Sequence, residues 1–186
     1  MITFVTGNKN KLAEVQAILG DAITSQNIDL DELQGTYNQI ITHKLQQAAE
    51  IVKGPVMVED TALEFDALGQ ELPGPYIKWF LKQLGPEKLP RMLDGFDNRQ
   101  GSAVCTVGYC DGPESQVHIF QGKTAGTIVD PRGPQTFGWD ACFEPLGYTE
   151  TYAEMAKPEK NKISHRGKAM DKFKQFLSER NSWNSL

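Results

Sequence analysis

Short apolar runs alternate with segments of helical spacing in the first third of the chain. Residues 2–7, ITFVTG, predict a buried strand that ends in a glycine turn. In residues 9–20 the apolar side chains recur three and four positions apart, and Gly20 stands where a helix would end. Residues 22–26 predict a second strand, which leads into a polar loop. Strand, helix and strand in this order favour an α/β fold.

A capping signal introduces the segment after this loop. Thr36 and Gln39 have the spacing of a capping box and precede apolar residues at helical intervals, which predicts a second helix. Residues 54–61, GPVMVEDT, then predict a strand that stops at two carboxylates. Residues 73–85 predict a helix with proline near its start, and residues 86–95 predict a shorter one.

The second half of the chain combines strand-like runs with a loop rich in glycine and proline. Residues 102–110 and 116–129 flank the turn sequence DGPE and are rich in β-branched and aromatic residues, which predicts a hairpin or meander. Residues 131–147 predict a long loop that carries aromatic side chains. The final helix has one apolar face, formed by Ala169, Met170, Phe173, Phe176 and Leu177. Because neither a repeat nor a linker interrupts this order, residues 1–186 predict a single α/β domain.

Composition restricts the classes of partner. The 186 residues are 39% hydrophobic and 23% charged, and they carry a formal net charge of −5. An acidic chain disfavours broad binding to nucleic acid or to a membrane surface, because both require a net basic surface. The start of the chain lacks a signal-peptide pattern, and the apolar runs are shorter than the ~18 residues of a membrane-spanning helix. We therefore expect no nucleic-acid partner, no membrane partner, and a cytoplasmic location that can extend to the nucleus.

The cysteines point to a reducing compartment. Cys105, Cys110 and Cys142 are too few and too widely spaced for a disulfide framework. Their spacing also lacks the paired Cys or His ligands of a zinc site. We expect them to be small buried apolar residues.

The turn after the first strand is a candidate anion site. A strand, a tight glycine turn and a helix start leave backbone N–H groups pointing outward, and Lys11 on the first helical turn could reach a phosphate. The alternative interpretation is a plain strand–turn–helix joint that Asn8 caps. This turn does not match the P-loop motif. The GKT sequence at residues 122–124 fails as well, since Val117 stands where that motif requires glycine. The candidate contacts are Thr6, Gly7, Asn8, Lys9, Asn10 and Lys11.

Carboxylates at the end of GPVMVEDT are candidate metal ligands. Glu59 and Asp60 are adjacent, and neighbouring strand residues point to opposite faces, so at most one of them faces a given site. With Glu32 from the preceding acidic loop, Asp60 could hold Mg²⁺, which prefers carboxylates together with phosphates and water. Mn²⁺ is an alternative ion. A solvated strand end is the alternative interpretation of the same residues.

Two further segments carry candidate nucleotide contacts. FGWD, residues 137–140, is either a plug over the core or a stacking platform for a base beside a carboxylate. Residues 157–168 concentrate positive charge in an acidic chain, and SHR at residues 164–166 should open the last helix, whose dipole adds to that charge. A solvated basic face is the alternative interpretation of this stretch. A phosphate cradle, a metal carboxylate, an aromatic platform and a basic clamp together are the parts of a nucleoside triphosphate site.

Ordered motifs along nearly the whole chain resemble the inosine triphosphate pyrophosphatase family in its eukaryotic form. They are TGN-x-x-K, IDL-x-E, GPVMVEDT, LPGPYIKWF, FGWD, TYAEM and EKNKISHR. The resemblance implies an enzyme that hydrolyses ITP, dITP and XTP to the monophosphate and pyrophosphate with Mg²⁺, which removes deaminated purines from the nucleotide pool. It also implies an α/β fold with a long central mixed β-sheet flanked by helices, two lobes with the active-site cleft between them, and a homodimer. The aromatic helix in LPGPYIKWF is our candidate for part of the dimer contact.

The resemblance assigns roles to the residues that match these motifs. Asp60 would be the catalytic residue, as a metal ligand that also orients or deprotonates water, and Glu32 would be the second metal ligand. The substrate contacts would be Thr6, Gly7, Asn8, Lys9, Asn10, Lys11, Lys44, Thr61, Lys78, Phe137, Gly138, Trp139, Asp140, Lys160, His165 and Arg166. Asp31 departs from the family, in which proline often precedes the glutamate, and adds charge near the metal.

We expect Arg166 to recognise the base, because its donors match the acceptors of a deaminated purine. Hypoxanthine presents the acceptors O6 and N7, which suit an arginine fork, whereas adenine offers a donor at position six. Guanine has the same O6, so its rejection must sense the 2-amino group. Two rival hypotheses are a pyrophosphatase for modified pyrimidine nucleotides and a nucleotide-binding sensor without turnover. The presence of both Glu32 and Asp60 disfavours the sensor, because binding alone does not need a metal-activated water.

Overall fold

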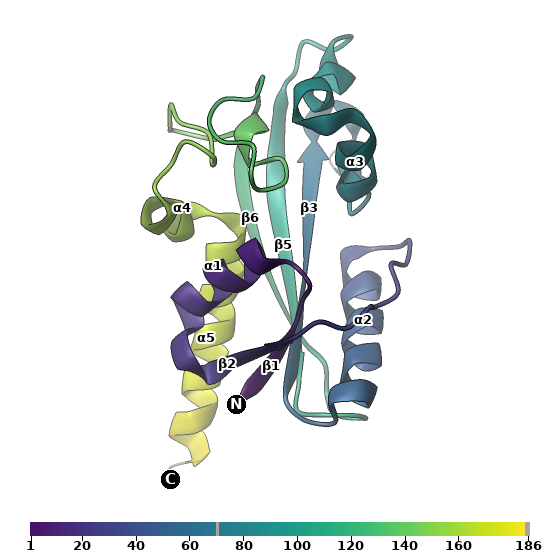
Figure 1. The fold of residues 1–186 in the computed structure, drawn as a ribbon, viewed down its shortest axis with the longest axis vertical. Coiled ribbons are helices and arrows are strands. Elements are labelled where there is room, and N and C mark those ends of the chain that lie inside the picture. Colours follow the sequence, from purple (N-terminus) through teal and green to yellow (C-terminus); the bar gives the residue numbers. More distant parts are fainter. Residues whose placement is uncertain (70, 185–186) are drawn as a thin grey trace. The chain divides into compact units, whose positions relative to one another are not determined.

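A computed structural model describes residues 1–69 and 71–184, which form helices around a mixed sheet (Figure 1). The strands are β1 (Ile2–Val5), β2 (Ile23–Gln26), β3 (Val56–Phe65), β4 (Pro73–Gly74), β5 (Gln100–Cys110), β6 (His118–Ile128) and β7 (Phe143–Pro145). The α-helices are α1 (Lys9–Leu19), α2 (Tyr37–Val52), α3 (Ile77–Lys88), α4 (Lys157–Ile163) and α5 (His165–Asn184). Short 3₁₀ turns lie at Gly20–Ala22, Asp66–Leu68, Leu89–Leu93 and Asp140–Cys142.

The sheet combines parallel and antiparallel neighbours. The strand order is β2-β1-β3-β5-β6-β7, and β4 pairs with β3 beside this path. β1 is parallel to both β2 and β3, whereas β4 is antiparallel to β3 and β7 is antiparallel to β6. The predicted α/β class with a central mixed sheet and flanking helices is therefore confirmed.

Contacts group the chain into two units. The first comprises Met1–Asp60, Cys105–Gly122 and the chain from Arg166 onward, and the second comprises Thr61–Val104 and Lys123–His165. Strands β3, β5 and β6 contribute residues to both units. Each unit buries its own set of apolar side chains.

Capping groups fix the two N-terminal helices of the first unit. Asn8 accepts hydrogen bonds through Oδ1 from the N–H groups of Asn10 and Lys11, at 3.0 and 3.1 Å, which starts α1. That helix ends at Gly20, whose φ of 66° favours glycine. α2 begins with the predicted capping box, in which the side chains of Thr36 and Gln39 each accept from the other's backbone N–H.

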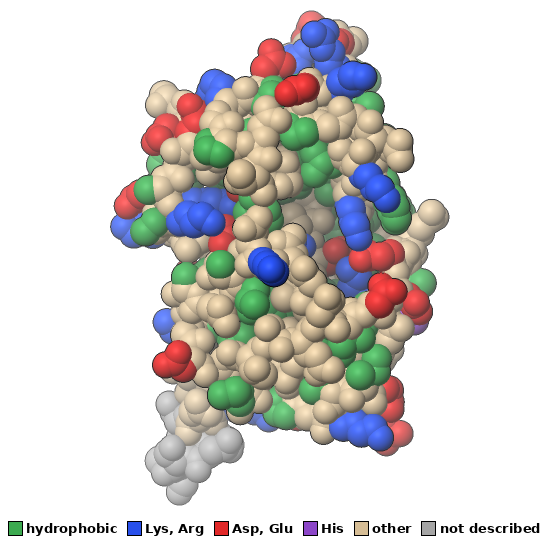
Figure 2. Space-filling model, in the orientation of Figure 1, with side chains coloured by type: hydrophobic (Ala, Val, Ile, Leu, Met, Phe, Trp, Pro, Cys, Tyr) green, Lys and Arg blue, Asp and Glu red, His purple; other side chains and the backbone are tan. Residues whose placement is uncertain are grey.

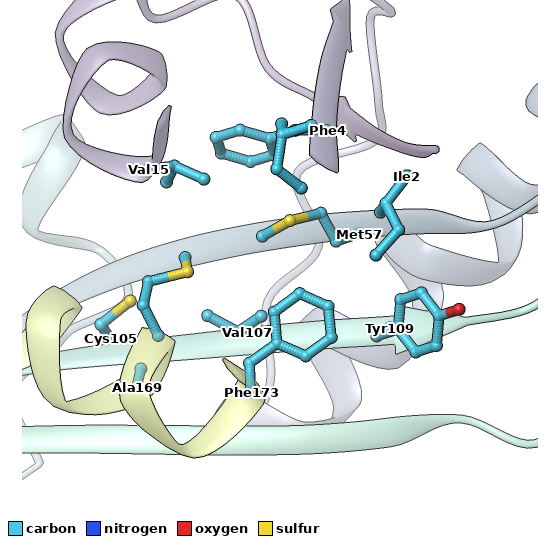
Figure 3. Packing of buried hydrophobic residues seen from close by; sticks show 11 residues of the cluster. Ile2, Phe4, Val15, Met57, Cys105, Val107, Tyr109, Ala169 and Phe173 are labelled. Carbon is cyan, nitrogen blue, oxygen red and sulfur yellow. The ribbon is translucent and has the colours of Figure 1, made fainter. Parts of the chain in front are cut away.

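Strand alternation gives the first unit two separate cores. Phe4 and Met57 point to the side that α1 and α5 cover, where they join Phe173 of α5 (Figure 3). Their neighbours Val5 and Val58 point to the opposite side and pack against α2. Successive residues of β1 and β3 thus face different helices, as a period of two requires. This alternation also decides which helix each polar residue of β3 meets.

The second unit has a core of its own. Its buried residues include Leu63, Phe65, Ile77, Leu89, Leu93, Ala103, Ile128, Trp139, Phe143, Tyr152 and Met155. α3 begins at Ile77, after the prolines, and its helical path breaks at Gly85, which has a φ of 70°. The predicted division of this segment into two helical pieces is therefore confirmed, with the break at that glycine.

Single elements confirm some of the sequence predictions and contradict others. The prediction that the strand stops at the carboxylates is wrong, because β3 continues to Phe65 with buried residues on both sides of the polar pair. GKT at residues 122–124 lies inside β6, so it is not a phosphate loop. Cys105, Cys110 and Cys142 are free and buried, as predicted. Among the described residues, no helix is long and apolar enough to cross a membrane.

Candidate active site

One cluster of charges lies on the α2 side of the first unit and is called here the carboxylate–lysine cluster. Lys44 of α2 places Nζ 3.3 Å from Oε2 of Glu32 and 3.4 Å from Oδ1 of Asp60. Glu32 comes from the loop before α2, and Asp60 comes from β3 on the face that α2 covers. Acidic side chains gather over the amino-terminal end of α2 (Figure 2). The structure thus brings together both predicted metal ligands and one predicted phosphate ligand.

Burial and charge act in opposite directions on the pKa values of this cluster. Burial disfavours the charged form of Lys44, but Asp60 and Glu32 outweigh that effect and raise the pKa of the ammonium above its ordinary value. For Asp60, burial raises the pKa of the carboxyl group, and the attraction of Lys44 and Lys11 offsets only part of this rise. A further cation beside Asp60 would therefore stabilise the charged form of this carboxylate.

The donor set of this cluster fits a magnesium-type ion. Two carboxylates from separate segments converge on one ammonium group, so a cation is already their common neighbour. Among the described residues, no group of three or more Cys, His, Asp and Glu side chains forms an all-protein metal cage. One or two carboxylates, completed by water and substrate phosphate, are the typical protein ligands of Mg²⁺.

A second cluster lies on the opposite face of β3 and is called here the buried ion network. Glu59 points toward α1 and α5, as alternation with Asp60 requires, and its side chain is 0% exposed. Arg166, at the start of α5, donates through Nη1 to Glu14 and lies 3.4 Å from Glu59 through Nη2. Lys11 Nζ lies 3.4 Å from the other oxygen of Glu59. Two cations and two carboxylates therefore neutralise one another inside the first unit.

Electrostatics inside the network favour the charged arginine. Burial alone would lower the pKa of Arg166, but Glu59 and Glu14 raise it above its ordinary value. The thiol of Cys105 lies 3.5 Å from Glu59, and burial together with that carboxylate raises the pKa of the thiol well above its ordinary value. Cys105 is therefore a neutral thiol in this network, in line with the prediction of a buried apolar cysteine.

The TGN turn is satisfied by local hydrogen bonds. Besides capping α1, Asn8 donates its own N–H to Oγ1 of Thr6 at 3.1 Å, and the N–H of Thr6 is bonded to the carbonyl of Gln26. Asn8 therefore caps the helix, as the alternative interpretation of this turn expects. An anion at this turn would have to compete with the Asn8 side chain for the N–H groups of Asn10 and Lys11.

In the second unit, FGWD divides into a buried and a surface part. Trp139 is 5% exposed and packs edge-to-face on Phe143 and beside His165, so it is the core plug of the two interpretations. Phe137 is partly exposed, and Lys160 places its ammonium 4.7 Å from the centre of that ring. Of the two aromatic residues, Phe137 is the more exposed one.

The basic stretch also divides by burial. Lys160 is buried on α4 and pairs with Asp140 through a contact of 2.6 Å between Nζ and Oδ2. His165 and Arg166 are buried at the start of α5, which begins where the SHR motif predicted. The other lysines of the stretch, Lys157, Lys162 and Lys168, are exposed. A wholly solvated basic face is therefore wrong for this segment.

Comparison with known proteins shows what the chain is similar to. Residues 2–176 match the Ham1 family. The chain belongs to the Ham1 family. A relative from Phaeosphaeria nodorum, named inosine triphosphate pyrophosphatase, is 55% identical over 181 residues, which is 96% of this chain and 95% of that protein. A relative of the same name from Emericella nidulans is 57% identical over 178 residues, covering 95% of this chain and 96% of that protein. The solved structure of a HAM1 protein from Coxiella burnetii is 27% identical, covers 96% of this chain and 98% of that chain, and superposes with a TM-score of 0.83.

Membership in the Ham1 family confirms the resemblance found in the sequence motifs and leaves single residue roles to geometry. The structure groups Lys11 with Arg166, Lys44 with Glu32 and Asp60, and Asp140 with Lys160. Thr61 follows Asp60 on β3, and Lys78 is exposed on the first turn of α3, where its ammonium lies 5.7 Å from the Trp79 ring. The roles of these two residues in substrate binding stay predictions.

Two residues of the buried ion network were not recognised from the sequence as partners of a cation. Glu14 lies beside the apolar face of α1, where a carboxylate is buried and therefore predicts a cation partner. Glu59 was considered only as a neighbour of Asp60, although its place on a buried strand predicts that it needs a cation. Both residues contact Arg166, which is separated from Glu14 by 152 positions.

Proposed function

We propose that this chain hydrolyses ITP, dITP and XTP to the nucleoside monophosphate and pyrophosphate. The observation that carries the proposal is the convergence of Glu32 and Asp60 on Lys44, because triphosphate hydrolysis needs a metal-binding carboxylate pair beside a phosphate-binding cation. Two curated relatives with more than half of their residues identical are named inosine triphosphate pyrophosphatase, which supports this substrate class. The reaction takes up one water and breaks the bond between the α- and β-phosphoryl groups.

The residues of the carboxylate–lysine cluster take defined roles in this proposal. Glu32 and Asp60 would hold Mg²⁺ or Mn²⁺, and the bound ion would neutralise phosphate charge and acidify water. Asp60 orients the attacking water and accepts its proton. Lys44 is then free to exchange its carboxylates for phosphate oxygens. Lys11 binds phosphate from the start of α1.

Substrate selectivity tests the proposed function directly. Pyrophosphate release should occur with ITP, dITP and XTP and be much slower with UTP, dTTP and ATP. Release from pyrimidine triphosphates would favour the pyrophosphatase of modified pyrimidines. Tight nucleotide binding without pyrophosphate release would favour the sensor. Release of orthophosphate in place of pyrophosphate would contradict the bond that we propose is broken.

A variant of Asp60 tests the catalytic assignment. Asp60→Asn should reduce turnover by about 10²-fold or more and change ITP binding far less, because it removes a metal ligand and a proton acceptor together. Asp29→Asn is the control, since Asp29 is an exposed carboxylate in the acidic loop that carries Glu32. An Asp60→Asn enzyme with turnover close to that of the control would remove Asp60 from the mechanism.

We also propose that the protein forms a homodimer through α3. Trp79 and Phe80 are 50% and 39% exposed on that helix, which is unusual for aromatic side chains of a monomer. Light scattering at micromolar concentration should give twice the 20.7 kDa mass of one chain. Trp79→Glu should shift the mass toward one chain, whereas Lys82→Glu on the same helix should do so less. A wild-type mass of one chain would exclude the dimer.

A further inference from the structure

The loop that carries Glu32 is attached to α2 by side chains. Residues 27–34 form neither helix nor strand. The backbone N–H of Asp31 donates to Oε1 of Gln47 at 2.8 Å. The carboxylate of Asp31 lies 3.3 Å from Nε2 of His43, and because a carboxylate only accepts, this nitrogen is the donor. His43 and Gln47 are four residues apart, so they lie on one face of the helix.

The same stretch of α2 also carries the cation that meets both metal ligands. Lys44 follows His43 directly and contacts Glu32 and Asp60. The Lys44 side chain is 10% exposed and the Glu32 side chain is 42% exposed, so the carboxylate half of this ion pair is open to solvent, which weakens its hold on the loop. The hydrogen bond from the backbone of Asp31 to Gln47 lies one residue from Glu32, so it restricts the backbone position of Glu32. The bonds to Asp31 therefore act together with the Lys44 ion pair on the position of Glu32.

We propose that Gln47 and His43 are positioning residues, which hold the metal-binding loop on α2 through Asp31. The inference rests on the proposed function, because it concerns the divalent-cation site formed by Glu32 and Asp60. Both residues act through Asp31, whose backbone N–H and carboxylate they contact. Their effect is to keep Glu32 within reach of the ion that Asp60 binds, which reduces the loop freedom lost when the ion binds.

The two anchors should differ in strength. The Gln47 bond joins a backbone donor to a side chain that is partly buried, whereas the His43 and Asp31 side chains are 40% and 64% exposed. Loss of one neutral hydrogen bond of this kind corresponds to about two- to tenfold in an equilibrium constant. We therefore expect a larger effect on metal affinity from Gln47 than from His43.

The test measures Mn²⁺ affinity in the absence of nucleotide, by water-proton relaxation of the full-length protein. Gln47→Ala should weaken Mn²⁺ binding by about two- to tenfold, and His43→Ala by less. Gln47→Glu retains the acceptor oxygen and should bind Mn²⁺ at least as tightly as the wild type. Gln46→Ala is the matched control, because Gln46 is exposed on the same helix. The Tm of each variant, compared with that of the wild type, checks that the fold is retained.

Kinetics give a second readout that a merely structural role would not produce. Gln47→Ala should raise the Mg²⁺ concentration needed for half-maximal pyrophosphate release, with kcat at saturating Mg²⁺ within about twofold of the wild type. Equal Mn²⁺ affinity in Gln47→Ala, Gln46→Ala and the wild type would overturn the inference alone. An equal loss in Gln47→Glu and Gln47→Ala would overturn it as well. Failure of the wild type to bind Mn²⁺, or binding that survives Asp60→Asn, would instead contradict the metal site on which the proposed function depends.

Discussion

Replacement of Arg166 by alanine tests whether the buried ion network stabilises the first unit. The guanidinium is 3% exposed, and its two carboxylate partners, Glu14 and Glu59, have side chains that are 3% and 0% exposed. Without Arg166, Lys11 is the remaining cation of the network, and it contacts only one of these carboxylates at 3.4 Å. At least one buried carboxylate would then have lost its cation inside the network.

The expected cost follows from this burial. Removal of one partner from a buried ion pair typically destabilises a protein by about 3–5 kcal/mol. For a chain of this size, each kcal/mol lowers Tm by about 2–4 °C, so we expect Arg166→Ala to unfold about 6–20 °C below the wild type. Lys168→Ala is the control, because Lys168 is exposed on the same helix and its removal should change stability by about 0.5 kcal/mol or less.

A double variant separates lost charge pairing from lost packing. Thermal unfolding is followed by circular dichroism for Arg166→Ala, for Glu14→Gln and for both substitutions together. The double variant should be more stable than the sum of the single effects predicts, because the neutral amide that Glu14→Gln introduces no longer needs a cation. Strict additivity, or an Arg166→Ala protein whose Tm lies within about 2 °C of the Lys168→Ala control, would refute the reasoning.

Further predictions concern phosphate binding, the FGWD loop and a surface ion pair. Lys11→Ala should weaken ITP and XTP together in steady-state kinetics, and a tenfold change in their ratio would mean that the lysine senses the base. Trp139→Ala should lower the free energy of unfolding in urea by about 3–5 kcal/mol, whereas Phe137→Ala should weaken binding of every purine nucleotide with a smaller loss of stability. Arg180 donates to Asp111 and lowers the pKa of that carboxyl group below its ordinary value of 3.8. At neutral pH, Asp111→Asn should therefore be less stable than the wild type. This difference should vanish as the pH falls below 3.8 and through the folded-state pKa, because the wild-type carboxylate is then protonated.

Local signals explain why most of the elements could be predicted from the sequence. The capping box of Thr36 and Gln39 and the end of α1 at Gly20 depend on residues a few positions apart, and both are present. The end of β3 was misplaced because two adjacent carboxylates resemble the solvated end of a strand. In the fold, each of them faces a helix that supplies a cation, so the strand continues through them to Phe65.

Contacts between distant segments were beyond the reach of the sequence pattern. FGWD contains the right residue types for either a plug or a platform, and only the packing shows that Trp139 belongs to the core and Phe137 to the surface. The partners of Arg166 come from α1 and β3, more than a hundred positions away. A basic residue in a basic stretch gave no sign that its charge is already neutralised.

The neutralised state of Arg166 changes how base recognition can be tested. A guanidinium that binds two buried carboxylates has to release at least one of them before it forms a fork with O6 and N7 of hypoxanthine. Such an exchange takes a cation away from a buried carboxylate, so the gain from the base must exceed the cost of that loss. If Arg166 does recognise the base, Arg166→Ala assayed well below its lowered Tm should lose about ten- to a hundredfold in kcat/KM for ITP and much less for ATP. Equal losses for both nucleotides would leave Arg166 as a structural cation, and discrimination between the purines would then have to come from groups other than this guanidinium.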